Sequence, residues 1–164
     1  MLTASQLNIL RDDLNESAAA KSTSVGSFFI GAGANSIVER QFSRSPVNTA
    51  ETTASTTYVE LTTTQQLTLT TSTLALIIVT ARLFVGTVDA IGFATNVVNG
   101  ASTIVADDNN ALVVTSSTVN ARARASVVRV ETGLTAGSNT FKAVYKTTAG
   151  TLTAASRELL ILPL

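Results

Sequence analysis

The chain has 164 residues, 45% of them apolar, which is enough for one domain with a sizeable core. It contains no histidine, cysteine or tryptophan, so the side chains most often used for proton transfer and for zinc or copper binding are absent. Eleven basic and eleven acidic residues cancel without forming a basic cluster, which argues against a nucleic-acid partner. We therefore expect a non-enzymatic structural or binding protein without a cofactor or a metal.

Charged residues make up only 13% of the chain, about half the usual share. A surface so poor in charge favours self-association, so a homo-oligomer or a larger assembly is expected. The longest apolar run, Leu74–Val79, is too short to cross a bilayer, and no membrane partner is expected. The absence of cysteine is compatible with synthesis in a reducing cytoplasm.

Residues 1–20 have the pattern of an amphipathic helix. Thr3-Ala4-Ser5-Gln6 fits a capping box, and apolar residues then recur at helical spacing, which predicts a helix from about Ala4 to Ala20. Its apolar stripe spans fewer than two heptads, too few for an independent coiled coil. The helix should dock either on its own domain or on a partner subunit or neighbouring copy, through Leu2, Leu7, Leu10 and Leu14.

Residues 21–54 have the composition of an extended arm or linker with short strands at Phe28-Phe29-Ile30 and Ile37-Val38. Phe28 and Phe29 are too apolar to remain in water, so we expect them to pack against another surface. Gly31-Ala32-Gly33 lacks the third glycine and the surrounding βαβ unit of a dinucleotide-binding turn.

Residues 55–164 are dominated by β-branched residues separated by short turn signals, and predict an antiparallel β-sandwich that is jelly-roll-like. The whole chain is thus mainly β, with the helix and the arm preceding the sandwich. The order of the strands stays open, since short strands permit more than one Greek-key arrangement. The expected strands are Thr57–Leu61, Gln65–Thr71, Leu74–Val85, Ile91–Val98, Ser102–Ala106, Ala111–Ser116, Ala121–Glu131, Ser138–Thr147 and Ser156–Leu162.

In two of these strands, the residue pattern predicts which side chains face the core. Between Asn139 and Lys146, apolar and polar residues alternate, with Phe141, Ala143 and Tyr145 on the inner side and a wet outer side. Leu74–Val79 is apolar at every position, so both of its faces should be covered. Because a sandwich buries only one face of each sheet, the second cover implies the N-terminal arm or a neighbouring subunit.

Few residues suggest chemistry. Asp107-Asp108-Asn109-Asn110 carries oxygen ligands but lacks the spacing of a calcium loop, so a solvated turn is expected. Serine or threonine nucleophiles would need a lysine or amino-terminal base, and no lysine lies in a matching motif. Arg122 and Arg124 share one strand face and would bind the carboxylates of a partner. Alternatively they shield an edge or pair within the fold, with Asp89, Glu131 or Glu158.

Three stretches carry a resemblance to a known group of proteins. They are the opening Met1–Leu14, the strand Ser55–Leu61, and the turn and strand Thr132–Phe141 followed by Tyr145. Together they resemble small virion proteins of tailed bacteriophages, particularly head decoration and head-fibre proteins.

The resemblance implies a β-sandwich, often trimeric, that projects outward from an N-terminal anchor. It implies a homotrimer bound to the major capsid protein on the outer surface of the head, after synthesis in the host cytoplasm. A receptor-binding module of a head or tail fibre, with a host surface receptor as its partner, is the alternative. The candidate capsid or inter-subunit contacts are Leu2, Leu7, Leu10, Leu14, Phe28, Phe29, Arg122 and Arg124.

Overall fold

The computed structural model describes residues 27–31, 37–118 and 122–164. The chain divides into two compact units, Met1–Phe42 and Ser43–Leu164. The helix expected in residues 1–20 lies outside the described residues.

In the first unit, strands β1 (Ser27–Gly31) and β2 (Ile37–Gln41) form an antiparallel pair. Phe28 lies opposite Arg40 and Phe29 opposite Glu39. The two short strands expected in this part of the chain are therefore confirmed.

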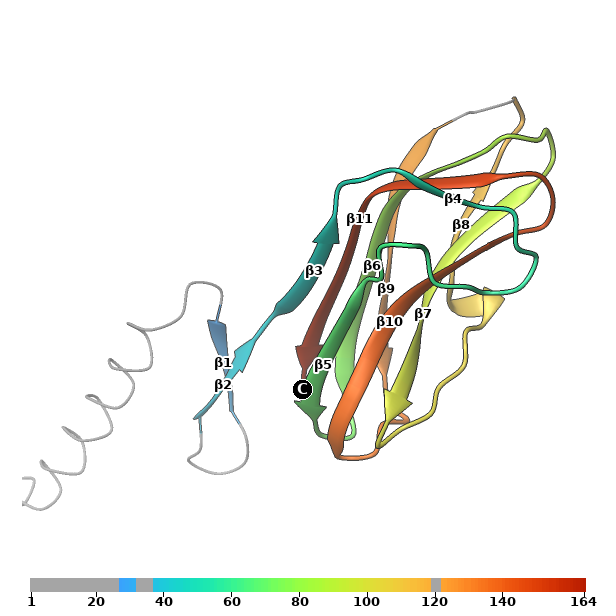
Figure 1. The fold of residues 1–164 in the computed structure, drawn as a ribbon. Helices are drawn as coiled ribbons and strands as arrows, with labels where there is room; N and C mark the ends of the chain where they lie inside the picture. Colours follow the sequence, from blue (N-terminus) through green and yellow to red (C-terminus); the bar gives the residue numbers. More distant parts are fainter. Residues whose placement is uncertain (1–26, 32–36, 119–121) are drawn as a thin grey trace, which may run out of the picture. The chain divides into compact units, whose positions relative to one another are not determined.

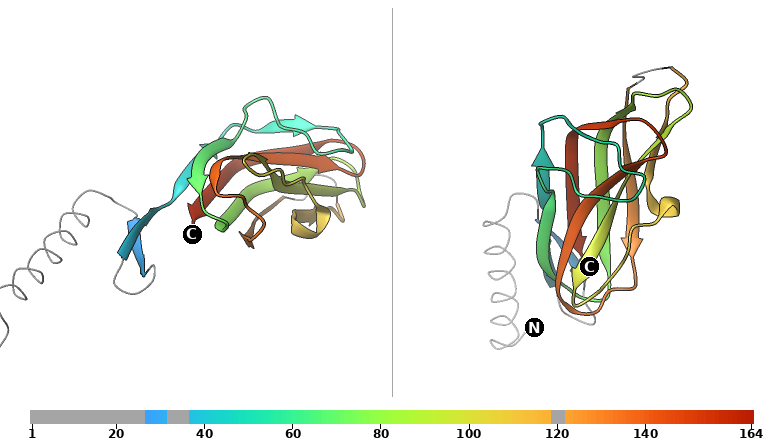
Figure 2. Two further views of the ribbon diagram at one scale, coloured as in Figure 1. Left: turned by 90° about the horizontal axis from the view of Figure 1, so that it is seen from below. Right: turned by 45° about the vertical axis from the view of Figure 1, so that its right-hand side comes forward.

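The second unit is a sandwich of two antiparallel sheets, as the sequence predicts (Figures 1 and 2). Sheet 1 contains β3 (Ser43–Val47), β4 (Glu51–Thr53), β6 (Ala75–Val85), β9 (Ala123–Glu131) and β11 (Leu152–Pro163). Sheet 2 contains β5 (Gln66–Thr71), β7 (Ile91–Gly100), β8 (Leu112–Thr115) and β10 (Gly137–Thr147). A short 3-10 helix, η1 (Asp108–Asn110), precedes β8.

The strand order is nested. In sheet 1 the order is β3-β11-β6-β9 and in sheet 2 it is β5-β10-β7-β8, while β4 pairs with the first part of β11. Leaving β4 aside, β3 thus pairs with β11, β5 with β10, β6 with β9, and β7 with β8 at the centre of the nest. A long antiparallel ribbon rolled into two sheets has this order, which is that of a jelly roll.

Most of the expected strands are confirmed within a few residues, but two are wrong. Around Thr57–Leu61 and Ser102–Ala106 the structure has only single bridges, between Val59 and Tyr145 and between Ile104 and Val98. Both segments run beside a longer strand without forming a ladder. Propensity alone did not decide their structure, since Val59 and Ile104 are half-buried and Val105 is 75% exposed.

Strands β3 and β4 come from the segment to which the sequence assigns an extended arm. They pair with successive parts of β11, so the sandwich unit begins at Ser43. Pro46 is exposed in β3, which lies at an edge of sheet 1, where a residue without an amide proton is tolerated.

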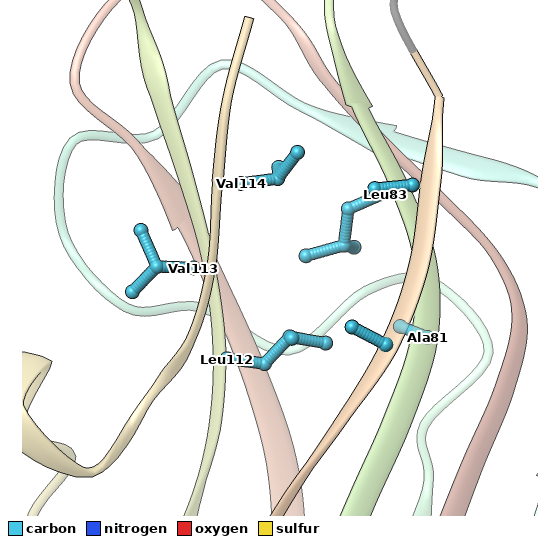
Figure 3. A pocket seen from close by; sticks show the side chains of 7 residues that line it. Ala81, Leu83, Leu112, Val113 and Val114 are labelled. Atoms are coloured by element: carbon cyan, nitrogen blue, oxygen red, sulfur yellow. The ribbon is translucent and has the colours of Figure 1, made fainter.

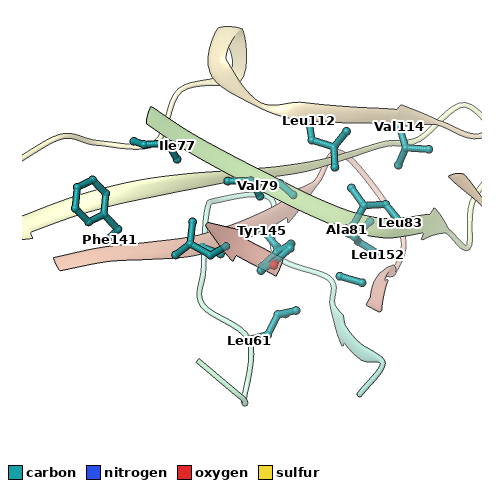
Figure 4. Close-up of a cluster of buried hydrophobic side chains, with 14 of the residues drawn as sticks. Leu61, Ile77, Val79, Ala81, Leu83, Leu112, Val114, Phe141, Tyr145 and Leu152 are labelled. Carbon is teal, nitrogen blue, oxygen red and sulfur yellow. The ribbon is translucent and has the colours of Figure 1, made fainter. Parts of the chain in front are cut away.

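Alternate side chains from both sheets fill the space between them (Figure 4). Ile77, Val79 and Leu83 on β6 are at most 1% exposed, as are Phe141 and Tyr145 on β10. The expected inner face of β10 is therefore confirmed. The core is a continuous aliphatic and aromatic layer, which is the principal source of stability in a chain without disulfides.

Strand β11 changes its inward-facing positions at a bulge. Its register with β6 shifts between Ala155 and Glu158, and Ser156 has a φ of +46°. Before the bulge Ala154 is buried, and after it Arg157 and Leu159 are buried. The extra residue thus turns an arginine toward the interior, where it needs a partner.

Gly100 ends β7 with a φ of +117°, and a Cβ there would lie 2.5 Å from the carbonyl oxygen of Ser138. We expect Gly100→Ala to lower the free energy of unfolding by about 1–3 kcal/mol, because both the φ and the contact are unfavourable. Gly133→Ala is the matched control, since its Cβ would lie 3.6 Å from the nearest atom, a carboxylate oxygen of Glu131. Urea unfolding followed by circular dichroism measures both, and equal losses would contradict the expectation.

Candidate interaction surface

The outer face of sheet 1 divides into two halves along its strands. The registers place Leu76 opposite Val130 and Ile78 opposite both Val128 and Leu160. These five residues are the apolar half; Val128 is 59% and Val130 53% exposed. Two neighbouring exposed valines beside three half-buried aliphatic residues form an apolar cluster of the kind found at contact sites.

The expectation that both faces of Leu74–Val79 are covered is correct for one face only. Alternate residues of β6 are buried in the core, whereas Leu76 and Ile78 on the other side are half-buried. The sandwich has two layers, so the core covers only one face of this strand.

The arginine half lies further along the same face. It consists of Arg82, Arg122, Arg124 and Phe84, with the Arg122 guanidinium 5.0 Å from the centre of the Phe84 ring. Arg82 and Arg124 are directly opposite each other on β6 and β9. Like charges at opposed positions destabilise a sheet, and Arg82 Nε is buried without a hydrogen-bond partner.

These arginines lack acidic partners within the described part of the chain. The other cations of the sandwich all form ion pairs: Arg44 with Glu158 (3.3 Å), Arg129 with Glu131 (3.5 Å), Lys142 with Glu60 (2.8 Å), Lys146 with Asp108 (2.6 Å) and Arg157 with Glu51 (2.9 Å). Glu131 and Glu158, two of the three acids considered as partners of Arg122 and Arg124, are therefore paired elsewhere. Asp89, the third, forms no ion pair with them.

The remaining candidates are placed as follows. Phe28 and Phe29 lie in β1. Leu2, Leu7, Leu10 and Leu14 lie outside the described residues. The structure brings Arg122 and Arg124 together with Arg82, a third arginine that sequence reasoning missed because it lies on another strand.

A groove opens between β8 and β9, at the side of the sandwich where the two sheets have unpaired edges (Figure 3). Leu112 and Val114 point toward Ala81 and Leu83 across it, whereas Val113 points away. Ala123 and Ala125 complete the lining. All of these residues are aliphatic, so the groove presents no side-chain hydrogen-bonding group with which to orient a polar substrate.

A buried ion pair holds β4 to β11. Arg157 is 1% exposed, and its Nη2 lies 2.9 Å from Glu51 Oε2. The amide of Thr63, at 3.1 Å, and its hydroxyl both donate to the Glu51 carboxylate. The pKa of Glu51 lies below its usual value of 4.5. The hydrogen bond from the Thr63 hydroxyl lowers it most, the Thr63 amide and the charge of Arg157 lower it further, and burial acts in the opposite direction.

The same cluster continues through Tyr145 and Gln65. Tyr145 donates its hydroxyl to Gln65 Oε1 at 2.6 Å, and Gln65 Nε2 donates to the Ser45 carbonyl at 2.8 Å. Burial raises the pKa of Tyr145 to about 12, so this tyrosine stays a donor near neutral pH. Sequence reasoning missed the cluster, since its members are far apart in the chain. Its contacts link β3, β10 and β11 and indicate a structural role.

The turn at Asp107–Asn110 is also held by the protein. Asp107 caps η1 by accepting from the Asn109 amide at 3.0 Å. Asp108 accepts from the Tyr58 hydroxyl at 2.9 Å and from Lys146 Nζ at 2.8 Å, and these bonds, that of Lys146 first, lower its pKa. The expectation of a solvated turn is confirmed, since all four residues are exposed, and the contacts of Asp108 additionally tie the turn to the sandwich.

The contact of Asp108 with Tyr58 and Lys146 also covers part of the outer face of β10, which the sequence predicts to be exposed to solvent. Val144 is only 4% exposed, and Lys146 Nζ lies 4.7 Å from the ring centres of both Tyr58 and Phe93. Covering loops therefore bury part of the outer face of sheet 2. The outer face of sheet 1 retains the larger exposed aliphatic cluster.

Within the described ranges, no helix is long and apolar enough to span a membrane.

No protein-family model and no curated protein matches the sequence. The infectious bursal disease virus VP2 subviral particle has a similar structure, with a TM-score of 0.50 and 13% identity over 82% of this chain and 37% of that chain. The T=1 particle derived from infectious bursal virus gives a TM-score of 0.50 and 12% identity, over 82% and 35% of the two chains. This chain thus spans little more than a third of theirs. At such identities the likeness shows a shared fold, that of a protein of viral particles.

Proposed function

We propose that the protein is a non-enzymatic structural component of a virion, most specifically a decoration protein on the outer surface of a tailed-bacteriophage head. The observation that carries this proposal is the nested jelly-roll order of the strands, shared with the VP2 chains of viral particles. The resemblance of the sequence to head decoration proteins adds the location. The proposed partner is the major capsid protein.

The proposed mechanism is mechanical reinforcement of the shell. Each copy buries apolar surface across a joint between capsid subunits, at roughly 25 cal/mol for each Å² removed from water. Many weak contacts engaged at once over a lattice give strong attachment through multivalency. The outer face of sheet 1, with its exposed valines and unpaired arginines, supplies a surface suited to such contacts.

A receptor-binding role is the alternative, and the aromatic residues count against its carbohydrate form. Sugar rings are commonly bound by stacking on exposed aromatic faces. Tyr145 is buried, and the ring of Tyr58 faces Lys146 while its hydroxyl binds Asp108. Neither tyrosine supplies a free stacking platform.

Titration of the full-length protein onto capsids that lack it, read by electron microscopy, tests the proposal. Regular density over the head shell is expected, and its local symmetry gives the oligomeric state. Density confined to a tail tip or a fibre end would overturn decoration and favour receptor binding.

Deletion of Met1–Ala20 is expected to abolish attachment to the shell while the sandwich stays folded, because the predicted leucine stripe is the proposed anchor. Co-sedimentation with capsids measures attachment, and circular dichroism confirms that the β-structure is intact. Capsid binding by the folded, truncated protein would contradict the anchor.

A further inference from the structure

Strand β5 forms one edge of sheet 2, and its outer side has no partner strand among the described residues. Edge strands that stay unpaired commonly carry a charge or a proline, or are very short. The strands that end the two sheets elsewhere follow this rule: β3 contains Arg44 and Pro46, β9 contains Arg124, and β8 has only four residues. β5 has six residues, none of them charged and none of them proline. Its edge is therefore open to pairing with another strand.

The ladder between β5 and β10 fixes which backbone groups of β5 are free. Ala143 donates its amide to the Gln65 carbonyl at 3.0 Å, in the register that β5 and β10 continue. Hydrogen-bonded and non-hydrogen-bonded pairs alternate in an antiparallel ladder. The amides and carbonyls of Gln66, Thr68 and Thr70 therefore point away from β10. Within the described ranges, no backbone hydrogen bond from another segment reaches these three residues.

The side chains of β5 alternate between the two faces of sheet 2. Gln66, Thr68 and Thr70 are exposed on the outer face. Leu67 and Leu69 pack against the core on the inner face, where they stay half-buried because they lie at its rim, beside the open edge. A strand that pairs with this edge must thus bring apolar side chains to the inner face and uncharged polar ones to the outer face.

A second copy of β5 itself meets this requirement. Antiparallel pairing about a two-fold axis at Thr68 places Thr68 opposite its own copy and Gln66 opposite Thr70. All three free residues of each strand then form hydrogen-bonded pairs. In the same register Leu67 lies opposite Leu69 of the second copy, so each copy covers the rim of the other's core. A net charge of zero leaves little repulsion between the copies.

We infer that two copies of this chain pair through β5 about a two-fold axis at Thr68, so that sheet 2 of one copy continues into sheet 2 of the other. An axis at Leu69 would instead place Gln66 opposite Ser72, which lies beyond the strand. The contact is isologous and joins two copies, unlike the homotrimer that the resemblance of the sequence implies. It uses neither residues 1–20 nor the outer face of sheet 1, and it does not depend on where the protein sits in a virion.

The absence of native cysteine allows a direct test by disulfide trapping in the full-length protein. Thr68→Cys places one cysteine of each copy at the axis, with the two Cα atoms about 5.5 Å apart, a separation that a disulfide spans. A covalent dimer is expected on a non-reducing gel after mild oxidation. Thr140→Cys is the matched control, because Thr140 lies opposite Thr68 on β10 and its hydroxyl is 2.9 Å from that of Thr68. One strand further from the axis on each side, its two copies are about 15 Å apart, and the dimer yield should be at least tenfold lower.

The register is tested by mixing Gln66→Cys and Thr70→Cys chains, one of them carrying a mass tag. A tagged–untagged heterodimer is expected, because each position faces the other in the second copy. Either variant alone should give at least tenfold less covalent dimer. Equal yields from Thr70→Cys alone and from the mixture would indicate random collision and contradict the pairing.

Removal of the free amide at the axis tests whether edge pairing holds the copies together. Thr68→Pro should raise the dissociation constant of the dimer at least tenfold in sedimentation equilibrium, because proline donates no hydrogen bond. Thr115→Pro is the control at the other edge of sheet 2, in β8. Ser116 donates its amide to the Ala90 carbonyl, so by the same alternation the amide of Thr115 points away from β7. Thr115→Pro should leave association unchanged, and circular dichroism confirms that both variants keep their β-structure.

Three results would overturn the inference. One is a covalent yield from Thr68→Cys no higher than that from Thr140→Cys. Another is a wild-type protein that stays monomeric, and the third is a folded Thr68→Pro variant that associates as tightly as Thr115→Pro. Failure of the full-length protein to bind capsids, with the Thr68→Cys dimer formed, would contradict only the proposed function.

Discussion

Replacing Glu51 with glutamine is expected to lower the free energy of unfolding by about 3 kcal/mol, because it leaves the Arg157 guanidinium charged, buried and unpaired. Glutamine keeps the size of the side chain and one oxygen that can accept from Thr63, so the change removes the charge and one acceptor oxygen without leaving a cavity. The effect should be read by urea unfolding at neutral pH with circular dichroism, since the chain has no tryptophan.

The double variant Glu51→Gln with Arg157→Met is the control. Replacing both members of a buried pair by uncharged groups is often neutral, so most of the lost stability should return. A loss below about 1 kcal/mol for Glu51→Gln alone would show that solvent screens the pair as it screens a surface ion pair.

The pH dependence of the same variant follows from the lowered pKa of Glu51. A carboxyl whose pKa is lower in the folded than in the unfolded state adds stability that is complete above the unfolded pKa and is lost as the pH falls through the folded pKa. The ordinary value is 4.5, and the folded value lies below it. The difference in unfolding free energy between wild type and Glu51→Gln should therefore be constant above about pH 5 and shrink at lower pH. A difference that grows on acidification would contradict this account.

The second large effect is expected at Leu159. This side chain is fully buried, so Leu159→Ala should cost about 2–5 kcal/mol through lost apolar burial and the cavity left behind. Leu160, the next residue, lies on the half-buried outer face opposite Ile78, and Leu160→Ala should cost only about 1 kcal/mol. Unfolding curves of the two variants measure the contrast, and equal costs would mean that the face assignment after the bulge is incorrect.

Leu159 and Leu160 show why the sequence could not predict which residues of β11 face the core. Alternation in β10 predicts its inner residues correctly, because apolar and polar side chains differ there. In β11, Leu159 and Leu160 are alike, and the bulge at Ser156 shifts which positions point inward. No local pattern of hydrophobicity encodes that shift, and the inward turn of Arg157 is equally invisible in the sequence.

The candidate surface was predictable in part. Two arginines two residues apart on a strand share a face, so Arg122 and Arg124 could be singled out from spacing alone. Arg82 enters the cluster only through the register of β6 with β9. The lack of an acidic partner for the three also required the structure, since it depends on where Glu131 and Glu158 are engaged.

By itself, the sequence determined that this protein is a mainly-β sandwich with threonine-rich strands that are poor in charge, because β-branched composition and a period of two are local properties of the chain. Only the tertiary structure decided the nested strand order, the membership of β3 and β4 in sheet 1, and the two halves of its outer face. These depend on pairings between residues far apart in the chain, such as β3 with β11 and β6 with β9. Their stability comes from burial shared across both sheets, which no single segment carries.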